Sequence, residues 1–184
     1  MNSTPRLTGL VLLAAVALSG GVLAAQQDII PLAQVAKSQR GSVTQRIANT
    51  EITITYGRPV ARGRTLFGTL VPYGRMWHPG ADDATTMATT RDTEINGKAL
   101  PAGKYSLWTI PREGAWTFIF NRNADVFHTS YPGEAADALR LDVTPEAGAH
   151  METLTYYFPV VEGKDATLRL HWGTLIVPLA IRVP

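Results

Sequence analysis

The residues most suited to chemistry lie between Arg62 and Thr85, where arginines, aromatic residues, a histidine and two aspartates are interrupted by glycines and prolines. Four arginines fall within eighteen residues around the start of this segment: Arg58, Arg62, Arg64 and Arg75. A guanidinium group offers a planar fork of N–H donors that fits a carboxylate, phosphate or sulfate. These arginines could bind an anion, or they could pair with Glu51, Asp82 and Asp83 and only fix the loop in place.

The same segment holds His78, Asp82 and Asp83, which are residue types that ligate zinc or non-haem iron. Their spacing matches no established metal motif, and Pro79 makes the chain after His78 rigid. The three side chains could instead supply an acid and a base, which would require neighbours that shift their pKa values. We expect no metal ion and no cofactor, and acid–base chemistry stays open.

Nucleophilic catalysis has little support, because the chain contains neither a Gly-x-Ser-x-Gly nor a Ser-x-x-Lys motif. Several aromatic residues could stack on a sugar ring or fill the core: Tyr73, Trp77, Tyr105, Trp108 and Trp116. Trp116 alternates with Phe118 and Phe120, which is typical of the buried face of a strand. Core packing is therefore the favoured interpretation for most of this set.

Glycines and prolines should fold this segment back on itself, because glycine permits backbone angles closed to other residues and proline fixes turns. The candidate ligand-binding residues are Arg58, Arg64, Tyr73, Trp77, His78, Asp82 and Asp83. Five of these side chains are expected to line one surface concavity: Arg64, Tyr73, Trp77, His78 and Asp82. The competing arrangement is an internal plug in which Arg64 and Arg75 bond to Asp82 and Asp83.

The flanking sequence predicts the β-strands that must position this loop. Ile52, Ile54 and Tyr56 alternate with polar residues, which is the period-two pattern of a half-buried strand. Further strands are expected at residues 42–48, 85–89, 93–95, 98–100, 105–110, 116–121, 139–143, 152–158, 167–172 and 175–181. Asn96-Gly97 is a strong hairpin signal. Gly173-Thr174 predicts a turn between the last two strands, and Pro178 places the last one at a sheet edge or a bulge.

This density of strands predicts an all-β fold, a β-sandwich that carries a long loop rich in glycine, arginine and proline. Jelly-roll and immunoglobulin-like topologies both stay open. Helix is expected only over one or two turns at residues 134–139, and the side chain of His171 is expected on the outward face of its strand. The domain should span residues 39–184, preceded by a linker over residues 25–38.

Residues 1–24 have the features of a signal peptide. An apolar run from Leu10 to Leu18 follows Arg6 and is too short to span a bilayer as a helix. Cleavage after Ala24 fits the small-residue rule, so the mature chain should begin at Ala25 or, less favourably, at Gln26. The alternative is a short membrane anchor. We expect an exported protein of the periplasm or the medium, with no membrane span after signal removal.

The composition limits the remaining functions. The chain has no cysteine, so it forms no disulfides and no cysteine-ligated metal site. It carries 17 Lys and Arg against 15 Asp and Glu, with no basic run, which argues against nucleic-acid binding. The expected partner is an unknown small ligand or a protein of the cell envelope.

Several motifs, taken in order, indicate a family. They are Tyr56-Gly-Arg-Pro59, Leu70-Val-Pro-Tyr-Gly74, Pro101-Ala-Gly-Lys-Tyr-Ser106, Trp116-Thr-Phe-Ile-Phe-Asn121 and Leu170-His-Trp172. From about residue 39 to residue 183 the chain resembles the bacterial domain-of-unknown-function family 2911 (DUF2911). The resemblance implies an exported, mostly β domain with no assigned activity. The family's central motif is close to W-R-x-G-A-N-E-A-T, whereas this chain has His78 in place of the arginine and Asp82-Asp83 in place of Asn-Glu. A family function that needs that arginine to grip an anion would therefore not carry over.

Three functions stay open. The first is a non-enzymatic ligand-binding or interaction module that uses the loop at residues 57–85. The second is an enzyme of the hydrolase type with its site on the same loop, and the third is a structural component of the cell envelope. A deep polar pocket at Arg64, His78 and Asp82 would favour the first two, whereas a large apolar patch or an open edge strand would favour the third.

Overall fold

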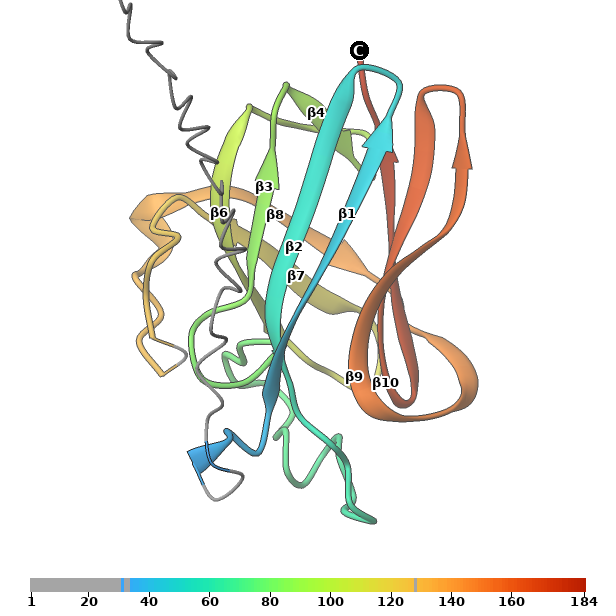
Figure 1. Ribbon diagram of the computed structural model, residues 1–184. Coiled ribbons are helices and arrows are strands. Elements are labelled where there is room, and N and C mark those ends of the chain that lie inside the picture. Colours follow the sequence, from blue (N-terminus) through green and yellow to red (C-terminus); the bar gives the residue numbers. More distant parts are fainter. Residues whose placement is uncertain (1–30, 32–33, 128) are drawn as a thin grey trace, which may run out of the picture. The chain divides into compact units, whose positions relative to one another are not determined.

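Two antiparallel β-sheets build the domain in the computed structural model, which describes residues 31, 34–127 and 129–184 (Figure 1). The larger sheet contains, in spatial order, β1 (Gln39–Ile47), β2 (Thr50–Arg58), β3 (Thr86–Thr89), β6 (Gly103–Ile110), β7 (Trp116–Asn121) and β8 (Asp137–Val143). The smaller sheet has the order β5 (Lys98–Leu100), β4 (Thr93–Ile95), β10 (Asp165–Arg182) and β9 (Glu146–Glu162). The prediction of an all-β sandwich is confirmed.

Val35–Pro184 forms one compact unit of the chain. The predicted signal peptide, residues 1–24, and most of the predicted linker, residues 25–38, lie outside the described residues. The boundaries of signal, linker and domain therefore stay predictions. Within the part of the chain that the structure describes, no helix is long and apolar enough to cross a membrane.

Side-chain alternation along β7 builds two hydrophobic clusters on opposite faces of the larger sheet. Trp116, Phe118 and Phe120 are fully buried in the main cluster between the sheets, as the sequence pattern predicts. Ile119 joins Trp108 in a second, smaller cluster. Because successive side chains of a strand point to opposite faces, this second cluster lies on the outer face of the larger sheet. Loops rather than another sheet cover it, through partly buried side chains such as Met76 and Tyr131.

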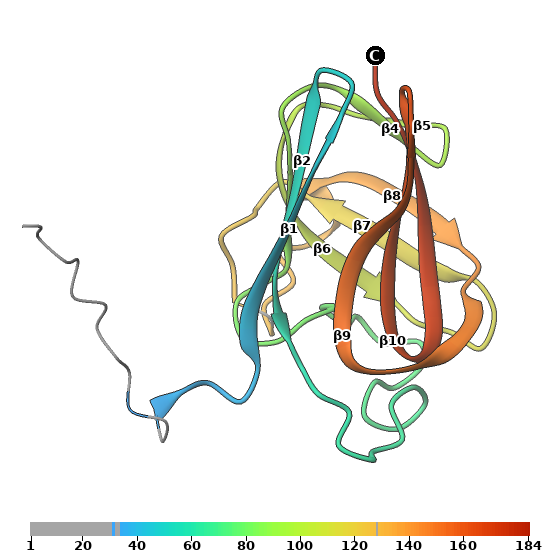
Figure 2. The same ribbon diagram turned by 45° about the vertical axis from the view of Figure 1, so that its right-hand side comes forward.

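The end of the chain corrects one prediction. The expected turn at Gly173-Thr174 is wrong, because one continuous strand, β10, pairs with a similarly long β9 in a bent hairpin (Figure 2). Gly173 has a φ of 58°, and the pairing register shifts on both sides of it. A glycine with positive φ accommodates such a bulge within a strand.

Two smaller expectations also change. His171 was expected to face outward, but it is only 5% exposed, because the irregular pairing brings its Nε2 to within 2.9 Å of the carbonyl oxygen of Ala149 on β9. The helix expected at residues 134–139 is reduced to the single 3₁₀ turn η2 (Glu134–Ala136), since β8 begins at Asp137. Pro178 lies between the stretch of β10 that pairs with β9 and the stretch that pairs with β4, so it interrupts neither ladder.

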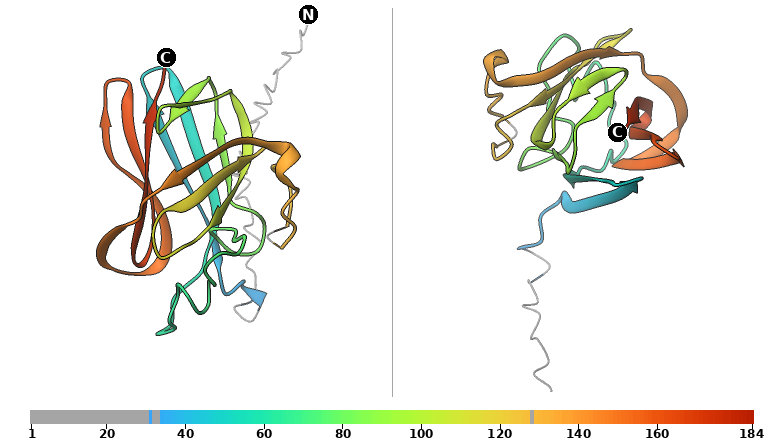
Figure 3. Two further views of the ribbon diagram at one scale, coloured as in Figure 1. Left: turned by 180° about the vertical axis from the view of Figure 1, so that it is seen from behind. Right: turned by 90° about the horizontal axis from the view of Figure 1, so that it is seen from above.

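The loop over residues 59–85 joins β2 to β3 and extends from one end of the sandwich (Figures 1 and 3). Backbone hydrogen bonds attach it to both sheets. Near its start, the N–H of Ala61 donates to the carbonyl of Glu152 on β9 at 2.8 Å. Further along, Trp77 and Thr109 of β6 exchange two N–H···O bonds of 2.7 and 2.8 Å. The loop is therefore an ordered platform rather than a simple connection.

Candidate functional site

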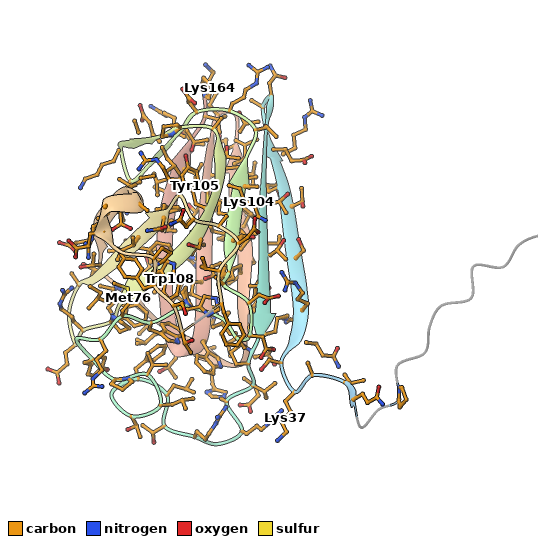
Figure 4. The ribbon with its side chains drawn as sticks, turned by 90° about the vertical axis from the view of Figure 1, so that its left-hand side faces the viewer. Lys37, Met76, Lys104, Tyr105, Trp108 and Lys164 are labelled. Carbon is orange, nitrogen blue, oxygen red and sulfur yellow. The ribbon has the colours of Figure 1, made fainter. Side chains whose placement is uncertain are left out.

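A cavity of about 530 Å³ lies beside this loop, over the second hydrophobic cluster. We call it the aromatic cavity, and its lining residues, among those that the structure describes, are Met76, Trp77, His78, Gly80, Ala81, Asp82, Trp108, Thr129 and Tyr131. They come from the 59–85 loop, from β6 and from the loop between β7 and β8. Met76 and Trp108 lie close together on the face turned to the viewer in Figure 4. The volume is within the range of about 300–1,000 Å³ that is typical of small-molecule sites.

The rings of the aromatic cavity are held in fixed orientations. Trp108 packs edge-on against His78 and Tyr131, with ring centroids 5.8 and 5.5 Å apart. Its indole N–H donates to Oγ of Ser106 at 2.9 Å. The hydroxyl of Tyr131 donates to Oδ2 of Asp137 at 2.7 Å, and burial, followed by this hydrogen bond, raises the pKa of Tyr131. Such preorganised rings lower the entropy cost of holding a ligand.

Trp77 lines the aromatic cavity and also a second cavity. Its half-buried ring lies nearly parallel to that of Trp172, with a centroid distance of 6.1 Å and an angle of 14°. Phe67 and Trp116 meet the same ring edge-on at 6.0 and 6.1 Å. These contacts tie Trp77 to the main core, so its ring is a rigid part of the lining that the two cavities share.

The second cavity, of about 370 Å³, is lined by three cationic side chains and by no carboxylate of the described residues. We call it the cationic cavity, and its lining residues are Lys37, Ser38, Pro59, Val60, Arg62, Arg64, Leu70, Val71, Trp77, Gly80 and Trp172. None of the ion pairs between described residues includes Lys37, Arg62 or Arg64. Their positive charge is therefore available to a ligand.

Main-chain carbonyls orient the two arginines of the cationic cavity. Arg64 donates from Nε to the carbonyl of Ala61 at 2.8 Å and from Nη2 to that of Val60 at 2.6 Å. Arg62 donates from Nη2 to the carbonyl of Lys37 at 3.3 Å. These bonds fix the guanidinium groups without neutralising them, because a carbonyl carries no net charge.

His78 has a structural partner inside the protein. Its side chain is buried, with 4% exposure, and its Nε2 accepts the backbone N–H of Thr85. Position 80 has no room for a side chain, because a Cβ atom at Gly80 would lie 2.4 Å from the Thr85 hydroxyl oxygen and 2.8 Å from Cε1 of His78. His78 thus closes a tight turn, and only part of its ring faces the aromatic cavity.

The five side chains expected in a single concavity are distributed over three neighbouring cavities. Trp77, His78 and Asp82 line the aromatic cavity, whereas Arg64 lines the cationic cavity. Tyr73 lines a third cavity of about 360 Å³ beside Gly173, and Arg64 lines this cavity as well as the cationic one. Shared residues connect the three, with Trp77 and Gly80 common to the first two and Arg64 common to the last two.

Two candidates, Arg58 and Asp83, lie away from all three of these cavities. Arg58, half-buried at the end of β2, donates from Nη2 to the Thr155 hydroxyl at 3.3 Å. Asp83 pairs with Arg40 on β1. The competing plug arrangement is not found among the described residues. Arg64 bonds to carbonyls, Asp83 pairs with Arg40, and no ion pair there includes Arg75. Among these same residues no group of three or more histidine and acidic side chains is placed to hold a metal ion.

Several lining residues were not among the candidates. Tyr131, Thr129 and Met76 complete the aromatic cavity, and Lys37 and Trp172 complete the cationic cavity. Tyr131 and Trp172 lie about fifty and ninety residues beyond the loop, and no local pattern links them to it. Lys37 lies at the end of the molecule from which the loop extends (Figure 4), and the sequence assigned it to a linker.

Comparison with known proteins identifies a family but no activity. The model of a family described as "Protein of unknown function (DUF2911)" matches residues 38–181. No curated protein and no solved structure matches the chain. The arrangement of the cavities is therefore the basis for any statement about function.

Proposed function

We propose that this chain, which belongs to the DUF2911 family, is a non-enzymatic carbohydrate-binding module that acts outside the cytoplasm. The aromatic cavity is the observation that carries the proposal. The half-buried rings of Trp77 and Tyr131 border a space of about 530 Å³, and Trp108, which is only 2% exposed, packs edge-on against Tyr131. The C–H faces of a sugar ring pack well on aromatic faces, so the cavity suits a pyranose.

The polar residues of the aromatic cavity fit the same ligand class. The exposed Asp82 and Thr129 lie among the lining residues and can bond to sugar hydroxyls. A small number of polar groups in an aromatic site is the usual arrangement for fixing the orientation of a ligand. A cationic ligand fits less well, because the neighbouring cavity carries Lys37, Arg62 and Arg64.

Binding is favoured over hydrolysis because of His78. A general base needs a free lone pair within reach of the substrate, and Nε2 of His78 already accepts the N–H of Thr85. Asp82 is exposed to solvent, and the other candidate carboxylate, Asp83, pairs with Arg40 elsewhere. The Nε2 lone pair of His78 is therefore not available to act as a general base, which favours binding.

Calorimetric titration with a panel of trisaccharides, both neutral and acidic, tests the proposal. We expect at least one member to bind and to shift backbone amide NMR signals around the aromatic cavity. Trp77→Ala should weaken this binding at least tenfold, since aromatic anchors dominate such sites. Phe127→Ala is the matched control, because this exposed ring lines a different cavity. A panel with no binding member would refute the proposal.

A second variant, Asp82→Asn, tests the same site in case Trp77→Ala does not fold. Asp82 has a φ of 61°, a conformation that asparagine also tolerates. Asp82→Asn should therefore fold normally and still weaken sugar binding, because a neutral amide accepts hydrogen bonds less strongly than a carboxylate. An unchanged affinity in both variants would place the sugar elsewhere on the protein and would also refute the proposal.

A further inference from the structure

The positive charge of the cationic cavity indicates which chemical group the ligand should carry in addition to a sugar ring. We propose that Arg62, Arg64 and Lys37 bind an oxyanion carried by the same carbohydrate, so that the ligand is an acidic saccharide bearing a carboxylate or a sulfate ester. This inference rests on the proposed function for the sugar ring, whereas the oxyanion site itself can be measured separately.

Arg64 is set up as an oxyanion donor. Its Nε and one Nη2 hydrogen are used by the carbonyls of Ala61 and Val60. A guanidinium has five N–H groups, so three of them stay available. The side chain is exposed, and the carbonyl bonds fix its plane before any ligand arrives. A preoriented guanidinium loses less conformational freedom on binding a carboxylate or sulfate.

Glu152 is an acidic side chain that bonds to the main chain of Arg62 and forms no ion pair with its guanidinium. Glu152 accepts the backbone N–H of Arg62 at 2.6 Å and contacts Nε2 of His150 at 2.8 Å. The bond with His150, followed by the backbone bond from Arg62, lowers the pKa of Glu152. No ion pair joins Glu152 to the guanidinium of Arg62 within the described residues, and Glu152 does not line the cationic cavity. The carboxylate therefore bonds to the main chain of Arg62 and also attracts its positive charge, but it forms no ion pair with the guanidinium, whose remaining N–H groups can still bond to an anion.

The two cavities are adjacent enough to serve one ligand. Trp77 and Gly80 line both of them. A sugar ring that packs on one side of Trp77 would therefore project its substituents, or the next sugar of a chain, toward Arg64. Lys37 and Arg62 add two further positive charges around that position. A neutral sugar could only hydrogen-bond to these three side chains, whereas a uronate or a sulfated sugar would also pair with their charge.

The oxyanion site is tested first without any sugar. Sodium sulfate is titrated against sodium chloride at constant ionic strength while the Nε–Hε NMR signals of the arginines are followed. We expect sulfate to shift the Arg62 and Arg64 signals and the backbone amides of residues 60–64. Arg46 and Arg91, which are exposed outside this cavity, are the internal controls. No shift, or equal shifts at all four arginines, would overturn the oxyanion site.

The saccharide is tested next by calorimetry. Trigalacturonate, its neutral methyl ester and a sulfated galactose trisaccharide distinguish a carboxylate from a sulfate ester and from an uncharged ring. We expect at least one acidic trisaccharide to bind at least tenfold more tightly than the methyl ester. The double variant Arg62→Gln, Arg64→Gln should remove that preference, so that the acidic trisaccharides and the methyl ester bind with about equal affinity. The control Arg46→Gln, Arg91→Gln removes the same charge and should keep the preference.

The outcomes separate this inference from the proposed function. Equal affinity for the acidic trisaccharides and the methyl ester would overturn the inference while carbohydrate binding stands. Loss of acidic preference in both double variants would also overturn it, because the effect would then come from net charge alone. Sulfate shifts at Arg62 and Arg64 without binding of any saccharide would refute carbohydrate binding and leave only an oxyanion site.

Discussion

The backbone N–H of Thr85 donates a hydrogen bond to Nε2 of His78 in a buried turn at the end of the long loop. The Thr85 hydroxyl donates to the carbonyl of Pro79 at 3.0 Å, and the same carbonyl accepts from the hydroxyl of Tyr156 at 3.0 Å. Because Nε2 accepts an N–H, the ring proton of neutral His78 is assigned to Nδ1. His78 therefore fastens the loop to the core and positions the neighbouring Trp77.

Replacing His78 should cost stability, whereas replacing Asp82 should not. His78→Ala leaves the Thr85 N–H without its acceptor and empties a buried space, so the free energy of unfolding should fall by about 2–3 kcal/mol. Asp82 is exposed, and Asp82→Asn should change that free energy by less than about 0.5 kcal/mol. Urea denaturation of both variants measures the difference. Similar small losses in the two would contradict the structural role of His78.

Most of the fold could be predicted because alternation is a local property. The period-two patterns on β2 and β7 predicted these strands with nearly their observed bounds. Gly173 shows the limit of that reasoning. A glycine followed by threonine is compatible with a hairpin turn and with a bulge, and the choice depends on pairing with β9, some twenty residues earlier in the chain. Local sequence carries no information on that pairing.

The candidate site was only partly predictable for a similar reason. The composition of the loop pointed to Trp77, Asp82 and Arg64 as possible lining residues, and each of them lines a cavity. Their division between cavities depends on where β6 and β9 hold the loop, at Thr109 and Glu152. These anchors are contributed by distant strands. Tyr131 and Trp172 reach the cavities by the same long-range packing, so no local signal could have found them.

Tyr131 gives a pH-dependent prediction. Its hydroxyl must stay protonated to donate to Asp137, and its pKa in the folded protein is raised from the ordinary value of 10.0. The stability that this bond contributes is therefore fully present below about pH 10. It is lost as the pH rises from there toward the higher pKa of the folded state. Tyr131→Phe should lower the free energy of unfolding by about 1–2 kcal/mol at pH 7, and this difference from the unmodified protein should shrink above pH 10.

Denaturation curves between pH 7 and about pH 11 measure this difference. Tyr73→Phe is the control, since none of the hydrogen bonds found among the described residues includes the hydroxyl of Tyr73, and it should show no such trend. A difference for Tyr131→Phe that stays constant with pH would mean that the Asp137 bond does not depend on the phenol proton as described.

Export is expected to remove the start of the chain. The apolar run Leu10–Leu18 and the small residues before Ala25 predict cleavage after Ala24. Mass spectrometry of protein recovered from the periplasm or the medium should give an N-terminus at Ala25, with Gln26 as the less favoured alternative. Protein that retains Met1 and sediments with membranes would instead support a short N-terminal anchor.

Gly57 should be irreplaceable because of its contact with Ala81 in the lining of the aromatic cavity. A Cβ atom at Gly57 would lie 2.2 Å from the carbonyl oxygen of Ala81, far inside van der Waals contact with main-chain atoms that cannot rotate away. Gly57→Ala must therefore displace the loop from β2 and lower the free energy of unfolding by about 2–3 kcal/mol.

Gly114→Ala is the matched control, because no heavy atom lies within 4 Å of a Cβ atom built at Gly114, and the φ of this residue is not positive. The control should change stability by about 0.5 kcal/mol or less and leave sugar binding intact, whereas Gly57→Ala should impair both. Equal behaviour of the two variants would show that the loop does not pack against β2 at Gly57 in solution. The contact between Gly57 and Ala81 would then not support the lining of the aromatic cavity.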